Sequence, residues 1–251
     1  MRPFRTIVLA LILPAVMIGA EPAAPDGQEI LRRVDDMWRG NSSAGLMTMN
    51  IKTAHWERTL KMKGYSKGKD LSLMRIVYPK SEAGTGTLKV DENIWNYLPK
   101  TRRVMKIPSS MMMGSWMGSH FTNDDLVKES RLEDDYDFEL VEKADEDGVL
   151  LYEITLTPKP DAAVVWGKIV ILVQADNLVL LLEEFFDEEL ELVRRMTFGN
   201  LTVLDDRTVP LSLRIVPVDK PEEYTEILYD KLLFDIPLDD DFFSLQNLKR
   251  R

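Results

Sequence analysis

The chain contains no cysteine and only two histidines among its 251 residues. The absence of cysteine excludes disulfide bonds, cysteine metal sites and thiol catalysis. It also excludes a lipoprotein anchor, because the lipid of such an anchor is attached to a cysteine. His55 and His120 are distant in sequence, and neither has a second histidine three or four residues away, so no histidine metal motif is present. A chain without thiols is well suited to an oxidising compartment.

Long apolar segments are also scarce. The apolar run from Thr6 to Ile18 is too short for a membrane-spanning helix, which needs about 20 residues. A basic start precedes this run and two small residues, Gly19 and Ala20, follow it, which is the pattern of a cleavable secretory signal. We therefore predict a signal peptide at residues 1–20, one domain at residues 21–251, and export to the periplasm without a lipid anchor.

Positive charge is in deficit. The chain has 42 acidic and 32 basic side chains, which gives a formal net charge of −10 at pH 7. Nucleic-acid binding needs a basic surface, so we expect no nucleic-acid partner. On net charge alone, the chain also gains nothing from anionic lipid head groups.

Periodicity predicts a mainly β domain. Ile30, Leu31 and Val34 recur at helical spacing behind Asp26, which predicts a capped helix over residues 28–38. Downstream, short runs that alternate apolar and polar residues are separated by turn residues, as in consecutive antiparallel hairpins. These runs are residues 44–52, 59–63, 71–78, 84–90, 94–98, 104–107, 136–143, 149–157, 167–173, 179–187, 190–198, 208–216 and 223–234.

We expect about ten or eleven strands from these runs. So many consecutive hairpins favour a single strongly curved antiparallel sheet, an unclosed β-barrel, with the N-terminal helix and short helical lid segments. A two-sheet sandwich is the alternative. No linker rich in proline, glycine or serine divides residues 21–251, which again predicts a single domain.

No pattern indicates catalysis. The chain lacks a G-x-S-x-G motif, a phosphate-binding glycine loop and a dinucleotide fingerprint. Acidic doublets such as Asp205-Asp206 would point to opposite faces of a strand, and they lack the pattern of a calcium loop. We therefore predict a protein that is not an enzyme and has no metal or cofactor.

The segment from Pro108 to Asp125 interrupts the hairpins and is rich in methionine. Methionine and tryptophan offer deformable apolar contact, while the glycines and serines between them allow mobility. The segment is therefore either a lid over an apolar cavity or a loop that plugs the sheet. Copper binding by the thioethers is a further alternative. The candidate wall and lid residues are Trp95, Tyr97, Met105, Met111, Met112, Met113, Trp116, Met117 and Phe121, together with Met47, Met49 and Met62 on earlier strands.

The central part of the sequence resembles the outer-membrane lipoprotein-sorting proteins of the LolA-like superfamily. The resemblance rests on Tyr78-Pro79-Lys80, Gly84-Thr85-Gly86, the run DENIWNYLP at residues 91–99, Arg102-Arg103-Val104 and the run GSHFTNDDL at residues 118–126. The ending from Phe242 to Leu248 is also similar. The resemblance covers nearly all of residues 21–251.

This resemblance implies an unclosed barrel whose apolar hollow accepts lipid acyl chains beneath covering helices. The implied function is periplasmic carriage of lipid or lipoprotein acyl chains towards the outer membrane. Such a carrier would meet an inner-membrane transporter as donor and an outer-membrane acceptor, and we expect a monomer. Two alternatives remain: an accessory subunit of an inner-membrane transporter that carries no lipid itself, and a hydrolase of envelope lipids.

Overall fold

The computed structural model describes residues 26–128, 132–162 and 164–250. The predicted signal at residues 1–20 lies outside these ranges. Within them, no helix combines the length and the apolar character that crossing a membrane would require.

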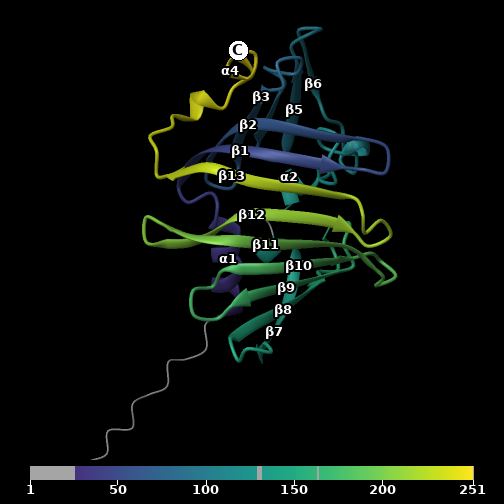
Figure 1. The fold of residues 1–251 in the computed structure, drawn as a ribbon, viewed down its shortest axis with the longest axis vertical. Coiled ribbons are helices and arrows are strands. Elements are labelled where there is room, and N and C mark those ends of the chain that lie inside the picture. The colour runs from purple at the N-terminus through teal and green to yellow at the C-terminus, as the bar shows by residue number, and fades with distance from the viewer. Residues whose placement is uncertain (1–25, 129–131, 163, 251) are drawn as a thin grey trace, which may run out of the picture.

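One antiparallel sheet of thirteen strands forms the body of the protein (Figure 1). Each predicted run forms a strand, so the single-sheet prediction is confirmed and the expected number of ten or eleven was too low. The strands are β1 (Ser42–Lys52), β2 (Glu57–Lys67), β3 (Leu71–Tyr78), β4 (Gly86–Val90), β5 (Asn93–Leu98), β6 (Arg103–Lys106), β7 (Tyr136–Ala144), β8 (Leu150–Pro158), β9 (Lys168–Gln174), β10 (Leu180–Phe186), β11 (Leu192–Leu204), β12 (Arg207–Pro217) and β13 (Tyr224–Phe234).

The strand order explains why the sheet stays open. Neighbours in the sheet are neighbours in the chain, except where β1 pairs with β13, and β6 and β7 form the two edges. The chain passes from β6 to β7 through residues 107–135, and we call the described parts of this stretch, residues 107–128 and 132–135, the covering segment. It contains the short helices η1 (Ser109–Met111), α2 (Asp125–Lys128) and α3 (Leu132–Asp135). Because it joins opposite edges, it must cross one face of the sheet.

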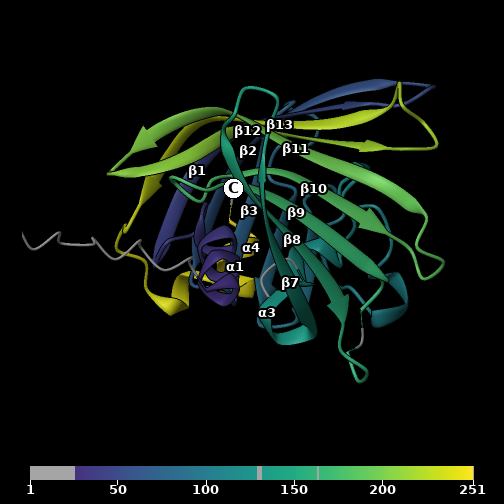
Figure 2. The ribbon, with the colours of Figure 1, turned by 90° about the horizontal axis from the view of Figure 1, so that it is seen from below.

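Helix α1 (Gly27–Asp36) lies on this same face, and Figure 2 shows the strands arching over α1 and α3. The predicted cap is present, since the Asp26 side chain accepts a hydrogen bond from the backbone N–H of Gln28. Ile30, Leu31 and Val34 are buried against the sheet, as their helical spacing predicts. The helix and the covering segment therefore close the concave face together.

The opposite face carries a second, smaller core over β3–β5. Leu73, Leu88 and Tyr97 are buried there against Phe243 and Leu248 from the C-terminal end of the chain. That end forms η2 (Asp240–Phe242) and α4 (Leu245–Leu248), which begins behind the capping Ser244. Strands β3–β5 are thus covered on both faces.

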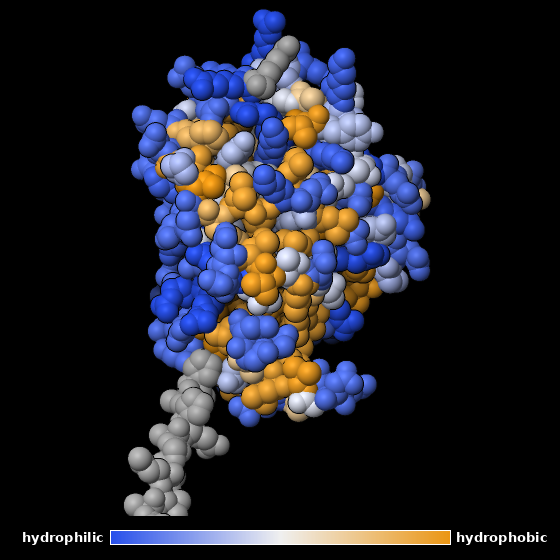
Figure 3. All heavy atoms as spheres, turned by 60° about the vertical axis from the view of Figure 1, so that its left-hand side comes forward, coloured by the Kyte–Doolittle hydropathy of each residue, from blue (hydrophilic) through white to orange (hydrophobic). Residues whose placement is uncertain are grey.

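Elsewhere the surface is less uniformly polar than the net charge suggests. Figure 3 shows apolar side chains gathered in a band on the face that it presents, bordered by hydrophilic residues. Exposed apolar side chains on the strands include Val203 and Leu233.

Candidate functional site

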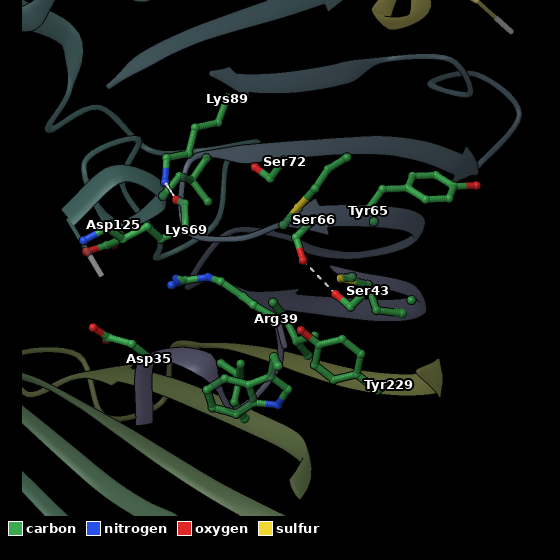
Figure 4. Close-up of a pocket in the computed structure, with 18 of the residues that line it drawn as sticks. Asp35, Arg39, Ser43, Tyr65, Ser66, Lys69, Ser72, Lys89, Asp125 and Tyr229 are labelled. Atoms are coloured by element: carbon green, nitrogen blue, oxygen red, sulfur yellow. Dashed lines mark hydrogen bonds between the residues drawn. The ribbon is translucent and has the colours of Figure 1, made fainter. Parts of the chain in front are cut away.

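A hollow of about 160 Å³ lies between the concave face of the sheet, α1 and the covering segment (Figure 4). Val34 and Trp38 line it from the helix side, and Trp116, Phe121 and Leu126 line it from the covering segment. Strands β1, β2 and β3 form its opposite wall. The concave face is therefore not completely filled by side chains.

The hollow exists because small residues are paired across three neighbouring strands. Ser43 pairs with Ser66 and Gly45 with Gly64 between β1 and β2, and Ser66 pairs in turn with Ser72 of β3. All five line the hollow. Since alternate residues of a strand point to the same face, these positions subtract side-chain volume from one patch of the wall.

The same strands become bulky further along. Met47 pairs with Met62, and Met62 pairs with Ile76. All three are at most 4% exposed and belong to the main core. The inward face thus changes within a few residues from glycine and serine to methionine and isoleucine, and the hollow ends where the large side chains begin. A Cβ atom at Gly64 would lie 2.9 Å from the Met47 Cε, which shows how closely the two zones meet.

Polar groups occupy part of the lining. The Ser43 and Ser66 hydroxyls are 2.7 Å apart. Lys89 is 5% exposed and its Nζ donates to the carbonyl oxygen of Lys69. Figure 4 shows the Arg39 side chain extending into the hollow. The cavity therefore offers apolar wall and hydrogen-bonding groups together, a combination suited to an amphiphile.

The covering segment is anchored in the core. Trp116 is 2% exposed, and its Nε1 donates a 3.0 Å hydrogen bond to Thr87 Oγ1. Thr87 Oγ1 donates in turn to Asn96 Oδ1 at 2.7 Å. The Phe121 and Trp116 rings are arranged edge to face, with their centres 6.4 Å apart. The segment therefore covers the hollow and also fills part of the concave face, so features of a lid and of a plug are combined.

A buried ion pair fixes the same segment to β11. The Arg194 guanidinium donates two hydrogen bonds to the Asp125 carboxylate, at 2.6 and 2.8 Å. Both side chains are buried, with 7% and 13% of their area exposed. The guanidinium also lies 4.3 Å from the Phe185 ring centre and 4.5 Å from that of Trp166. The Asp125 carboxylate accepts the backbone N–H of Thr122 as well, so α2 is held by several bonds at one point.

A second polar cluster superficially resembles a catalytic array. His120 Nδ1 lies 2.9 Å from Thr225 Oγ1, and its Nε2 lies 3.3 Å from a Glu223 carboxylate oxygen. Thr225 is completely buried, however, and its hydroxyl oxygen accepts the backbone N–H of His120. A nucleophile must be reachable by its substrate, so we interpret this cluster as a structural tie between the covering segment and β13. Among the described residues, no group of three or more histidine, aspartate or glutamate side chains is arranged to hold a metal ion.

The predicted site residues are distributed over four places. Met47, Trp116 and Phe121 line the hollow. Met49 and Met62 are buried in the main core, and Met117 packs against it. Trp95 and Tyr97 lie in the second core on the opposite face. Met105, Met111 and Met113 are exposed, and Met112 is half-buried.

Sequence reasoning missed most of the wall. The missed residues share small size and inward orientation: Ser43, Gly45, Gly64, Ser66 and Ser72. Their signal was present as glycine and serine at alternate positions of strands whose other inward positions are large and apolar. It could be interpreted only with the register, which places these positions beside one another.

The sheet is curved and unclosed, and it shelters a partly apolar hollow beneath a covering segment, which is the arrangement that the resemblance to the LolA-like superfamily implies. A family model described as an uncharacterized protein family matches residues 68–250, and the chain therefore belongs to that family. A comparison with curated protein sequences found no match.

Three solved structures share the fold over nearly their whole length. A DUF1329 family protein from Desulfovibrio piger is 25% identical, with a TM-score of 0.77 over 88% of this chain and 96% of its own. An outer-membrane lipoprotein-sorting protein domain from Vibrio parahaemolyticus is 24% identical, with a TM-score of 0.75 over 88% and 97%. A LolA-superfamily protein from Nitrosomonas europaea is 19% identical, with a TM-score of 0.73 over 88% and 98%.

Proposed function

We propose that this protein carries the acyl chains of a lipid or lipoprotein through the periplasm towards the outer membrane, and shields them in the hollow. The observation that supports carriage most directly is the set of small residues paired across β1, β2 and β3. Filling these positions with larger apolar residues would stabilise the core, since each buried methylene contributes about 0.8 kcal/mol. Because small residues occupy these positions instead, the wall leaves room for a ligand.

The size of the hollow limits what it holds. About 160 Å³ is below the 300–1,000 Å³ typical of ligand pockets. In this conformation it accommodates part of a single acyl chain. A cargo with several chains requires the covering segment to move outward, and the ties at Asp125 and Trp116 are the contacts that such a movement must break.

The exchange partners belong to the same proposal. A carrier of this kind receives its cargo from an inner-membrane transporter and passes it to an outer-membrane acceptor. It needs no catalytic group, because transfer makes and breaks no covalent bond. The likeness to a lipoprotein-sorting protein domain from Vibrio parahaemolyticus agrees with this cargo class.

Filling the hollow tests the proposal. Ser72 lines the cavity, and Ser72→Phe should abolish uptake of a fluorescent fatty acid by the purified protein. Ser212 of β12 offers a matched control, because it alternates with the inward Leu213 and so points to the convex face. Ser212→Phe should leave uptake unchanged. Equal uptake by both variants, with both folded by circular dichroism, would refute carriage in this hollow.

A further inference from the structure

Three methionines of the methionine-rich region are exposed and take no part in lining the hollow. Met105, Met111 and Met113 are 43%, 54% and 48% exposed. They lie on β6 and on the first turns of the covering segment. Large apolar side chains clustered on a surface commonly mark a site of interaction. These methionines are therefore the part of the methionine-rich stretch that is exposed to solvent, whereas Trp116 and Phe121 are buried in the core.

The stretch of sequence that carries these methionines has a charge opposite to that of the whole protein. No aspartate or glutamate occurs between Asn93 and Asn123, although the chain has 42 acidic residues. The same stretch contains Lys100, Arg102, Arg103 and Lys106, and all four are exposed. Lys106 lies over the Trp95 ring. No described acidic side chain forms an ion pair with Lys100, Arg102 or Arg103.

We propose that this surface docks the protein on a lipid membrane that contains anionic head groups. We call it the basic methionine surface and define it as Lys100, Arg102, Arg103, Met105, Met111 and Met113. Exposed apolar side chains beside lysine and arginine are the composition of interfacial membrane-binding segments. The cations are attracted to the head groups, while the methionines enter the boundary with the acyl chains.

Net charge does not oppose this contact. Electrostatic interactions are screened beyond about 10 Å at 0.1 M salt, so a membrane senses the local surface rather than the total of −10. The acidic tip at Asp145, Glu146 and Asp147 follows β7, which is the sheet edge opposite β6. The local charge of this surface therefore favours attraction to anionic lipids, although the net charge of the chain does not.

The surface is continuous with the cover of the hollow. Met113 is followed three residues later by Trp116, whose ring lines the cavity. Docking through Met111 and Met113 would bring that cover against the bilayer. The role of this contact in loading or releasing cargo rests on the proposed carriage. The docking itself is measured by vesicle binding, which does not depend on carriage.

Vesicle binding tests the proposal. The purified protein is sedimented with vesicles of phosphatidylcholine alone, or of phosphatidylcholine and phosphatidylglycerol in equal parts. The test variant combines Lys100→Gln, Arg102→Asn and Arg103→Gln; asparagine suits position 102, whose φ is +54°. The control variant combines Lys61→Gln, Lys63→Gln and Lys231→Gln, three exposed cations of β2 and β13. Both variants change the net charge equally.

We expect binding to the anionic vesicles only, and weaker binding at high salt. Since each cation near such a surface contributes about 1 kcal/mol, the test variant should bind roughly a hundredfold more weakly, and the control should bind as the unaltered protein does. Met111→Ser with Met113→Ser should also weaken binding, and this loss should persist at high salt.

Three outcomes would overturn the docking. They are equal binding by the two charge variants, equal binding to neutral and anionic vesicles, and capture by soluble polyglutamate without any vesicle binding, which would assign the surface to an acidic protein. Carriage is scored separately by the fatty-acid uptake of Ser72→Phe. Vesicle binding without any uptake by the unaltered protein would refute carriage and retain the docking.

Discussion

Replacing Asp125 by asparagine should destabilise the protein strongly, because it leaves the Arg194 guanidinium without its counter-charge. The two side chains are 13% and 7% exposed, so solvent screens their interaction little. Removing one partner of a buried pair typically costs about 3–5 kcal/mol. Each kcal/mol lowers Tm by about 2–4 °C in a protein of this size. We therefore expect Asp125→Asn to lower Tm by about 10 °C.

The double variant separates charge from packing. In Asp125→Leu with Arg194→Met both charges are gone, and apolar side chains occupy the site between Trp166 and Phe185. Such replacements are often neutral or stabilising. Thermal and urea unfolding of the single and double variants gives the coupling free energy through a double-mutant cycle. A loss below about 1 kcal/mol in Asp125→Asn would refute the reasoning, since it would mean that the pair behaves like an exposed one.

Two further predictions concern Glu223 and the second core. The Glu223 pKa is lowered, chiefly because its carboxylate accepts the backbone N–H of Ala54. Its stabilising contribution is therefore present above the ordinary carboxyl pKa near 4.3 and is lost as the pH falls through the lower folded value. Glu223→Gln should flatten the fall of Tm below pH 5, and parallel Tm profiles would contradict this. Phe243 is 5% exposed and packs in the second core with Leu73. Phe243→Ala should lower the free energy of unfolding in urea by about 3–5 kcal/mol. Leu245→Ala, at a position that is 40% exposed, should lower it little. Equal losses would argue against a second core.

The strands could be predicted because alternation is a local property. In β2, Leu60 and Met62 alternate with exposed lysines, and the structure buries the first set and exposes the second. All thirteen runs form strands, so the expected number of ten or eleven was below the number of runs themselves. Even β6, with four residues, was recognised as the run at residues 104–107, because turn residues separate it from β5, with which it pairs.

The face on which an apolar residue lies was harder to predict. Trp95 and Tyr97 are large, apolar and close in sequence to the covering segment, which suggested the cavity wall. In β5 it is Asn96, between them, that bonds to Thr87 beneath the covering segment. The two aromatic residues point the other way, where the C-terminal end covers them. Since both faces of β5 are covered, its pattern alone does not distinguish them.

The methionine-rich segment shows the limit of composition most clearly. Its apolar residues were predicted to act together, as a lid or as a plug, but the backbone turns divide them. Trp116 faces the core and bonds to Thr87, whereas Met111 and Met113 face solvent. Composition indicates how much apolar surface a segment has, and only the backbone path decides whether that surface meets the hollow or the exterior.

The topology of the sheet connects these two roles. Because β6 and β7 lie at opposite edges, the chain must cross the concave face once, and the covering segment makes that crossing. Trp116 follows Met113 after two intervening residues, and Asp125 of the ion pair follows nine residues after Trp116. If the basic methionine surface binds a membrane, the contacts that close the hollow lie directly downstream in the chain. Asp125→Asn should then raise the rate of fatty-acid uptake more than it alters vesicle binding, since it loosens the cover and leaves the docking residues unchanged.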